Sequence, residues 1–271
     1  MTVYVGTCGY SYADWKGVLY PDKAKPGEML GIYARRFAAV EVDATYYRVL
    51  PPKTFESMAA RTPEHFRFTV KLPGSVTHAP AVPTAVHPDA ELWREGIEPL
   101  VAAGKLACGL MQFPNAFKPG ERSETYLHAL VEALPGIRLV AEFRNREWQT
   151  DATLRLLREL GIGWTNVDEP QFRTLLRPGS DVTAPIAYVR FHGRNAAQWW
   201  KGDNATRYEY LYTADELKPW ISRVQDLAAD PTVREVYAYF NNHRSGNAVR
   251  NAEMFETMLR EQLGATVAAA V

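Results

Sequence analysis

Short apolar runs recur along the chain, separated by stretches whose apolar residues have helical spacing. The eight runs are five to eight residues long and rich in Val, Ile, Phe and Tyr, as is typical of buried strands. They cover residues 3–7, 40–45, 66–72, 106–113, 139–143, 162–167, 186–191 and 236–240. The helical stretches cover residues 28–37, 54–61, 89–103, 123–134, 150–161, 214–227 and 247–263.

This alternation predicts an α/β fold, a (β/α)8 TIM barrel formed by residues 1–271 as a single domain. The loop-like composition of residues 169–185 indicates that the helix after the sixth strand is short or missing. A doubly wound open sheet is the alternative, but no Gly-rich phosphate turn follows the first strand. Residues 264–271 form a small apolar tail that we expect to fray.

Most of the strands end in two polar residues spaced i, i+2, which therefore share one face. In a barrel these faces point inward, at two depths. The upper layer, at the C-terminal mouth, is predicted to hold Asp43, Lys71, Gln112, Arg144, Asp168, His192 and Asn241. The layer beneath it is predicted to hold Glu41, Thr69, Leu110, Glu142, Asn166, Arg190 and Tyr239. A register slip of one residue would reverse any strand's contribution.

Composition narrows the classes of function. Lys+Arg and Asp+Glu are both 31, so no bulk positive charge favours a dedicated nucleic-acid binder. No basic leader and no apolar stretch of roughly 20 residues is visible, so we expect a cytoplasmic protein without a membrane partner. Cys8 and Cys108 offer neither a metal-binding spacing nor a disulfide framework.

The strand ends also supply candidate catalytic groups. Glu142 and His192 are predicted to form an acid/base pair, because both types of side chain can transfer protons near neutral pH. Lys71 is a third candidate, either stabilising an oxyanion or forming a Schiff base. A salt bridge from Lys71 to Asp43 or Glu41 is an equally open interpretation.

The remaining candidates are predicted to bind and orient the substrate. Arginine suits carboxylate or phosphate groups, and amides and aromatic rings suit polar ligands. These residues are Asp43, Tyr46, His78, Gln112, Arg144, Trp148, Asp168, Arg190, Asn241 and Asn242. The alternative for the deeper charges is a structural ion network that joins Glu41, Glu142 and Arg190.

Histidines and carboxylates are too few at the mouth to indicate a metal cage. Of the six histidines, His78, His192 and His243 fall near strand ends. No cofactor is predicted and no metal ligand is assigned. A divalent metal stays possible but is not favoured.

Several motifs together resemble the YecE-like family, domain of unknown function 72. They include Gly6-Thr7-Cys8-Gly9-Tyr10-Ser11-Tyr12, Glu41-Val42-Asp43, Glu142-Phe143-Arg144, Arg190-Phe191-His192-Gly193 and Tyr239-Phe240-Asn241-Asn242. The resemblance covers nearly the whole chain and implies a TIM barrel whose activity is not established. Cys8 stands where a Ser is usual in this family, and Asp43 where an Asn is usual.

The residues and the resemblance together favour an enzyme. Its substrate is predicted to be a small polar or anionic molecule, phosphorylated or carbohydrate-like, processed by acid/base chemistry at the mouth. Hydrolysis, isomerisation and lyase chemistry all remain open, as does the oligomeric state. The alternatives are a barrel that binds nucleic acid or cleaves phosphodiesters, and a ligand-binding protein without catalysis.

Overall fold

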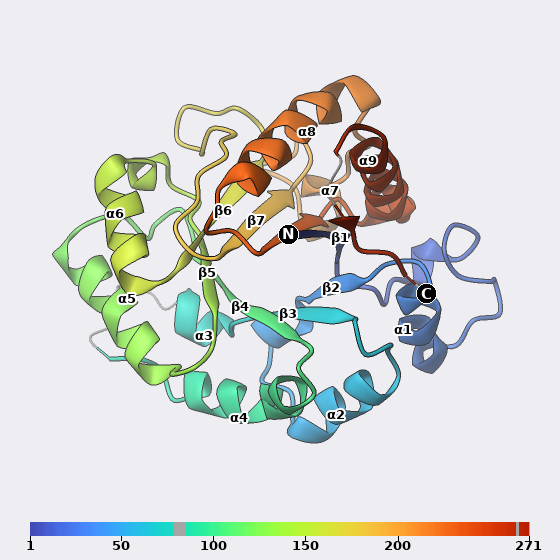
Figure 1. Ribbon diagram of the computed structural model, residues 1–271, viewed down its shortest axis with the longest axis horizontal. Helices are drawn as coiled ribbons and strands as arrows, with labels where there is room; N and C mark the ends of the chain where they lie inside the picture. The colour runs from blue at the N-terminus through green and yellow to red at the C-terminus, as the bar shows by residue number, and fades with distance from the viewer. Residues whose placement is uncertain (79–84, 264–265, 271) are drawn as a thin grey trace.

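A closed ring of parallel strands surrounded by helices forms the computed structural model (Figure 1). The structure describes residues 1–78, 85–263 and 266–270. Strands follow one another around the ring in chain order, and pairing of β1 with β2 closes it. The barrel strands are β1 Thr2–Cys8, β2 Ala39–Val42, β3 Arg67–Lys71, β4 Leu106–Gln112, β5 Leu139–Glu142, β6 Gly163–Asp168, β7 Ile186–Phe191 and β8 Glu235–Phe240. The predicted TIM barrel is confirmed.

Helices occupy most of the connections between strands. They are α1 Pro26–Ala34, α2 Pro52–Ala60, α3 Gly74–Thr77, α4 Asp89–Ala102, α5 Glu121–Ala133, α6 Asp151–Leu160, α7 Asn204–Arg207, α8 Ala214–Ala229 and α9 Asn247–Gln262. Residues 169–185, between β6 and β7, contain no helix, as predicted. Helix α6 is capped at both ends, because Thr150 Oγ1 accepts a hydrogen bond from the Thr153 amide and Gly161 ends the helix at a φ of +67°.

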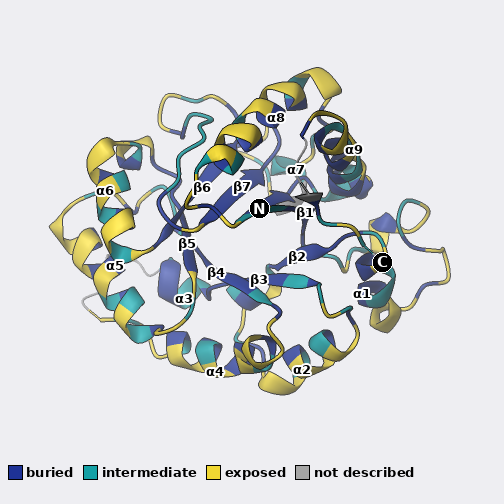
Figure 2. Ribbon diagram, viewed as in Figure 1, coloured by how far each residue is buried: buried dark blue, intermediate teal, exposed yellow. Residues whose placement is uncertain are grey.

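Apolar side chains form two cores, one between the barrel and its helices and one inside the barrel. Figure 2 shows the strands buried and the outer helix faces exposed. Inside the barrel, tyrosines and small residues fill the lower half, whereas charged side chains follow above them. Among the described residues, no helix combines the length and apolar character needed to cross a bilayer.

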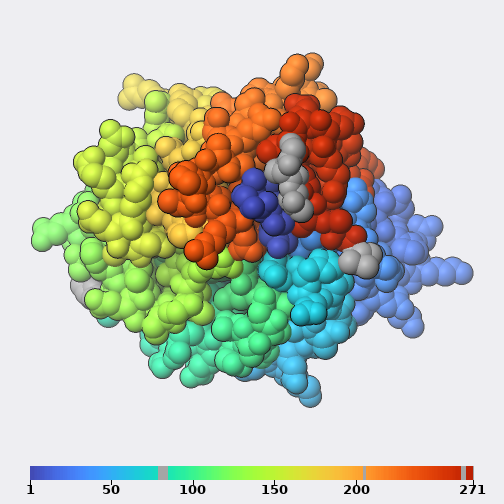
Figure 3. Space-filling view, in the orientation of Figure 1, coloured from blue at the N-terminus to red at the C-terminus, as the bar shows by residue number. Residues whose placement is uncertain are grey.

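The C-terminal segment corrects one expectation. Thr266–Val267 form a further strand, β9, which pairs in parallel with Thr2 and Val3 of β1. The Ala268 amide also donates to the Val3 carbonyl at 2.8 Å. These residues are therefore held by backbone hydrogen bonds rather than frayed, while residues 264–265 and 271 lie outside the described residues. Figure 3 shows the N-terminal residues, in blue, beside the red C-terminal region on this face.

Candidate functional site

Two adjoining cavities open where the barrel strands end at their carboxyl ends. The first, here called the polar chamber, has a volume of about 340 Å³ and is lined by Asp43, Lys71 and Asn241 among others. The second, the aromatic chamber, has a volume of about 330 Å³ and is lined by Trp199 and Trp200 among others. The two chambers share the residues Tyr46, His78, Gln112, Arg207 and Tyr208.

Most predicted site residues meet at these chambers. Strand ends supply the deeper part of the walls, and the loops after β2 and β3 supply Tyr46 and His78. The residues that the structure brings together are Asp43, Tyr46, Lys71, His78, Gln112, Arg144, Arg190 and Asn241. The i, i+2 pattern therefore locates the mouth correctly for β2, β3, β4, β5 and β8. On β7, Arg190 of the predicted deeper layer lines the polar chamber, and His192 lines neither chamber.

Strand β6 has the opposite register from the one predicted. The Asp168 carboxylate accepts hydrogen bonds from Arg194 at 2.8 and 2.7 Å, from the Tyr212 hydroxyl at 2.7 Å and from Trp220 Nε1 at 2.7 Å. Trp220 belongs to α8, so Asp168 faces the helices and not the mouth. Asn166 points the same way and bonds to Asp181 of the following loop. Asp168 anchors the loop after β7 and does not line either chamber.

Trp148 and Asn242 also lie away from the predicted site. Trp148 is fully buried, stacks on Phe143 at 4.4 Å between ring centroids and donates from Nε1 to the Phe117 carbonyl at 2.7 Å. The Asn242 amide donates to the Tyr210 carbonyl and to Asn251 Oδ1, both at 2.8 Å. Both side chains therefore support loops around the mouth from behind, and neither contacts the chambers.

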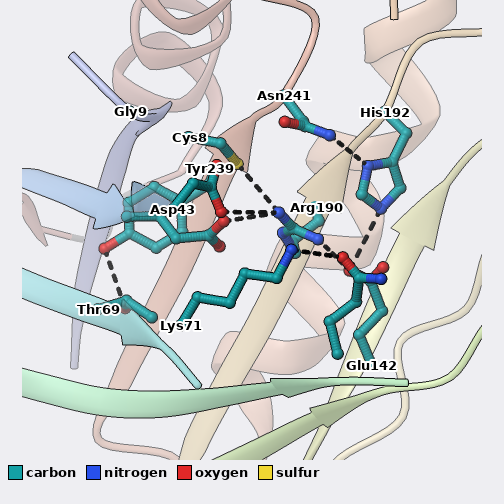
Figure 4. A network of polar contacts seen from close by, with 12 residues as sticks. Cys8, Gly9, Asp43, Thr69, Lys71, Glu142, Arg190, His192, Tyr239 and Asn241 are labelled. Atoms are coloured by element: carbon teal, nitrogen blue, oxygen red, sulfur yellow. Dashed lines mark hydrogen bonds and ion pairs between the residues drawn. The ribbon is translucent and has the colours of Figure 1, made fainter. Parts of the chain in front are cut away.

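Five charged side chains of alternating sign form a chain beneath the mouth, here called the buried charge chain. Arg144 contacts Glu169 through Nη1 at 3.2 Å and Glu142 through Nε at 2.6 Å. Arg190 contacts Glu142 through Nη1 at 2.7 Å and Glu41 through Nη2 at 2.6 Å. Glu142 is thus shared by both arginines, and Figure 4 shows it beside Arg190. All five are buried, so the charges neutralise one another rather than being solvated.

The three glutamates of the buried charge chain differ in their pKa values. Burial alone would raise the pKa of Glu142, but Arg144, Arg190 and His192 hold it well below its usual range. Burial raises the pKa of Glu41 to about 7, even though Arg190 opposes the shift, and Asp43 adds to it. Burial likewise raises the pKa of Glu169 to about 8 against the pull of Arg144. Glu142 is therefore the permanent anion, and the two end glutamates are the proton-holding members.

His192 is held as a neutral ring by partners on both sides. Burial lowers its pKa to about 3, and Arg144 adds to this effect while Glu142 opposes it. Asn241 Nδ2 donates to Nδ1 at 3.1 Å, so Nε2 carries the proton and donates to Glu142 Oε2 at 3.2 Å. Both ring nitrogens are engaged. Glu142 and His192 thus contact each other and line neither chamber, and the acid/base role predicted for them stays a prediction.

Lys71 and Asp43 are the charged groups whose partners leave them open to the polar chamber. Lys71 Nζ donates to Gln112 Oε1 at 2.8 Å and lies 4.4 Å above the Tyr46 ring. No carboxylate of the described residues lies within 4.0 Å of this amine. The buried Oδ1 of Asp43 has no hydrogen-bond partner among the described side chains and lies 3.9 Å from Arg190 Nη2. The predicted salt bridge from Lys71 to Asp43 or Glu41 is therefore not formed.

One cluster in the described part of the chain has the donor spacing of a metal site. Ligand atoms of Cys8, Glu41 and Asp43 lie within 4.8 Å of one another. Arg190 Nη2 already contacts Glu41, and it lies 3.5 Å from Cys8 Sγ. Burial also raises the pKa of the Cys8 thiol well above its usual range. A guanidinium among the donors and a protonated thiol both disfavour a cation at this place.

Sequence reasoning missed Glu169 and Arg207. Glu169 follows Asp168 directly, so the slip that turns Asp168 outward turns Glu169 inward, onto Arg144. The adjacent acids Asp168 and Glu169 at the end of the sixth strand were the signal from which Glu169 could have been found. Arg207 ends the short helix α7 in a long loop without strand periodicity, where no pattern points to the mouth.

Replacing Glu169 with glutamine is expected to flatten the pH dependence of stability above pH 6.5. A carboxyl group whose pKa folding raises from 4.5 to about 8 keeps its proton while the unfolded chain loses it, so stability falls as the pH rises through this window. Below pH 6.5 the lowered pKa of His192 opposes that trend. Wild-type stability should therefore fall by about 1–2 kcal/mol between roughly pH 6.5 and pH 8, as measured by urea unfolding.

The exposed Glu98→Gln substitution provides the control for this experiment, because it removes a glutamate from the surface of α4. It should retain the wild-type slope. An equal slope in Glu169→Gln and wild type would contradict the assignment of Glu169 as a proton-holding group.

Comparisons with known proteins agree with the barrel and its motifs. The family model described as "Protein of unknown function DUF72" matches residues 4–270. The UPF0759 protein YunF of Bacillus subtilis (strain 168) is 30% identical over 274 residues, which cover 95% of this chain and 94% of that protein.

Solved structures give the same result. A DUF72 family protein from Thermotoga maritima MSB8 is 39% identical, with a TM-score of 0.86 over 96% of this chain and 100% of its own. A DUF72 family protein from Enterococcus faecalis V583 is 26% identical, with a TM-score of 0.84 over 95% of each chain. The chain therefore belongs to the family of proteins of unknown function DUF72.

Proposed function

We propose that the protein is an enzyme that acts on a small anionic substrate by acid/base chemistry in the polar chamber. The observation that carries this proposal is Lys71, a cation without an acidic partner among the described residues, which lines an open cavity at the C-terminal mouth. Catalytic groups of TIM barrels gather at this end. An ammonium group in such a place can bind a carboxylate or phosphate that enters from solvent.

A second cation strengthens the case for an anionic ligand. Arg207 lines both chambers, and its Nη2 donates a 3.5 Å hydrogen bond to the Gly202 carbonyl. No acidic side chain of the described residues lies within ion-pair distance of its guanidinium. Lys71 and Arg207 thus present two positive charges to the same cavity.

Asp43 is the group best placed to accept a proton. Asp43 lines the same chamber as Lys71 and its side chain is 23% exposed, while its buried Oδ1 lies 3.9 Å from Arg190 Nη2. In this proposal Lys71 holds the anionic group, Asp43 acts as the base, and Asn241 and Gln112 orient the substrate. Glu142 and His192 act behind them, because their polar atoms are committed to the arginines and to Asn241.

A thermal-shift screen with pairs of metabolites tests the preference for an anion. Each pair should contain one compound with a carboxylate or phosphate and its neutral amide or alcohol counterpart. We expect stabilisation by one or more anionic members and not by their counterparts, since ligand that binds the folded state raises the melting temperature. Lys71→Met should remove the shift, and Lys218→Met, at an exposed position of α8, should preserve it.

Equal shifts from charged and neutral members would contradict this proposal. Oligonucleotide binding that weakens steeply with salt would favour the nucleic-acid alternative instead.

A further inference from the structure

The aromatic chamber indicates what else the substrate carries. We propose that, beside the anionic group held in the polar chamber, the substrate has a flat apolar ring that lies in the aromatic chamber against Trp200. This inference rests on the proposed function, because it extends the same site. It concerns the class of substrate: an anion attached to an aromatic ring system.

The two chambers are positioned to hold one molecule. Five lining residues belong to both, so the space beside Lys71 directly adjoins the space beside Trp200. Gln112 lies at the junction and bonds to Lys71 at 2.8 Å. An anion bound at Lys71 would therefore place its substituent toward the aromatic chamber.

Trp200 lines the aromatic chamber and exposes 56% of its surface. Its neighbour Trp199 is buried and packs against Tyr208, with 5.9 Å between ring centroids. Trp200 contacts the ring of Phe172, with 5.8 Å between ring centroids, and still exposes more than half of its surface. An exposed indole inside a concave surface has a free face on which a second ring can stack.

The charge in the aromatic chamber also fits a neutral ring. Arg144 lies at its base with the Trp199 ring 5.7 Å away, but Glu142 and Glu169 already pair with this guanidinium. Leu175 supplies a buried apolar wall. At this base an anionic group would meet an arginine that is already paired, whereas a π face would meet indole, guanidinium and methyl groups; Arg207, which lines both chambers, remains available to the anionic group.

The aromatic chamber is large enough to hold an aromatic ring. An apolar cavity of roughly 150 Å³ binds one benzene molecule, and the aromatic chamber measures about 330 Å³. A single or fused double ring therefore fits without displacing the walls.

Titration calorimetry with matched anions tests the inference. The probes are methyl phosphate and 1-naphthyl phosphate, together with acetate and 1-naphthylacetate, so that both kinds of anion are covered. For wild type we expect the naphthyl member of at least one pair to bind about tenfold tighter or more than its small partner, as one stacked ring allows. Trp200→Ala should reduce this gain to about threefold or less while leaving the affinity for the small anion unchanged.

Two further variants make the result specific. Leu211→Ala removes another exposed apolar side chain of the same loop region, one that lines neither chamber, and should retain the full gain. Trp200→Phe, which keeps a ring, should retain more of the gain than Trp200→Ala.

Failure of the ring inference and failure of the proposed function would give different results. If the anions bind in a Lys71-dependent manner but the naphthyl group adds nothing, or its gain survives in Trp200→Ala, the ring inference is wrong and the proposed function stands. If no anion binds, or Lys71→Met binds all probes as wild type does, the proposed function fails and the ring inference fails with it.

Discussion

Replacing Arg190 with methionine is expected to destabilise the protein by about 3–5 kcal/mol, the usual cost of leaving a buried charge without its partner. The arginine is almost fully buried and contacts both Glu41 and Glu142 at less than 3 Å. Methionine fills similar space but cannot donate hydrogen bonds. Glu41 and Glu142 would then stay buried in the barrel interior without Arg190. Arg144 would be the remaining cation of the buried charge chain.

Urea unfolding at pH 7 measures this loss. Arg244→Met is the matched control, because Arg244 pairs with Glu209 at 2.9 Å on the surface and such exposed pairs contribute about 1 kcal/mol or less. The double variant Arg190→Met/Glu41→Gln should recover part of the loss by removing one stranded carboxylate. A loss in Arg190→Met no larger than that in Arg244→Met would show that the buried charge chain does not hold the barrel interior together.

Replacing Lys71 with methionine is expected to lower kcat/KM about 100- to 1,000-fold on any substrate that the enzyme turns over, as the removal of one preorganised electrostatic group typically does. The residue is 9% exposed and lines a chamber in which no acid of the described residues forms an ion pair with its amine. Its contribution to folding is one hydrogen bond, to Gln112, and a contact with Tyr46. Stability should therefore change by only about 1 kcal/mol.

Steady-state kinetics and urea unfolding must be measured on the same preparation. Lys218→Met removes an exposed lysine of α8 and should leave both quantities unchanged. Full activity in Lys71→Met would exclude this lysine from the chemistry. Unfolding of the variant would instead assign Lys71 to the structural network, together with Glu142 and Arg190.

The strand-end pattern predicted much of this architecture because inward polar residues are rare in buried strands and so carry information. Lys71, Arg144 and Asn241 were placed at the mouth from their i, i+2 spacing alone, and the structure puts each of them there. The pattern failed for β6. Alternation gives two possible registers, and polar residues occur on both faces: Asn166 and Asp168 on one, Thr165 and, directly after the strand, Glu169 on the other.

Side chains far away in the sequence determine the direction in which Asp168 and Trp148 face. Asp168 is satisfied by Trp220 and Tyr212, which lie on a helix and a loop that follow another strand. Trp148 likewise packs behind the strand ends rather than in front of them, although its position after β5 is compatible with either side. Local spacing cannot distinguish an acid that binds a ligand from one that anchors a loop, because both are buried and both are hydrogen-bonded.

The central claim is that Lys71 holds the anionic group of a small substrate in the polar chamber. A crystal structure of the protein with an anionic ligand identified by the thermal-shift screen tests it most directly. We expect the carboxylate or phosphate within hydrogen-bond distance of Lys71 Nζ, about 2.7–3.2 Å, with Asp43 facing the remainder of the molecule. A ligand bound outside the two chambers, or one inside them whose anionic group contacts neither Lys71 nor Arg207, would contradict the account.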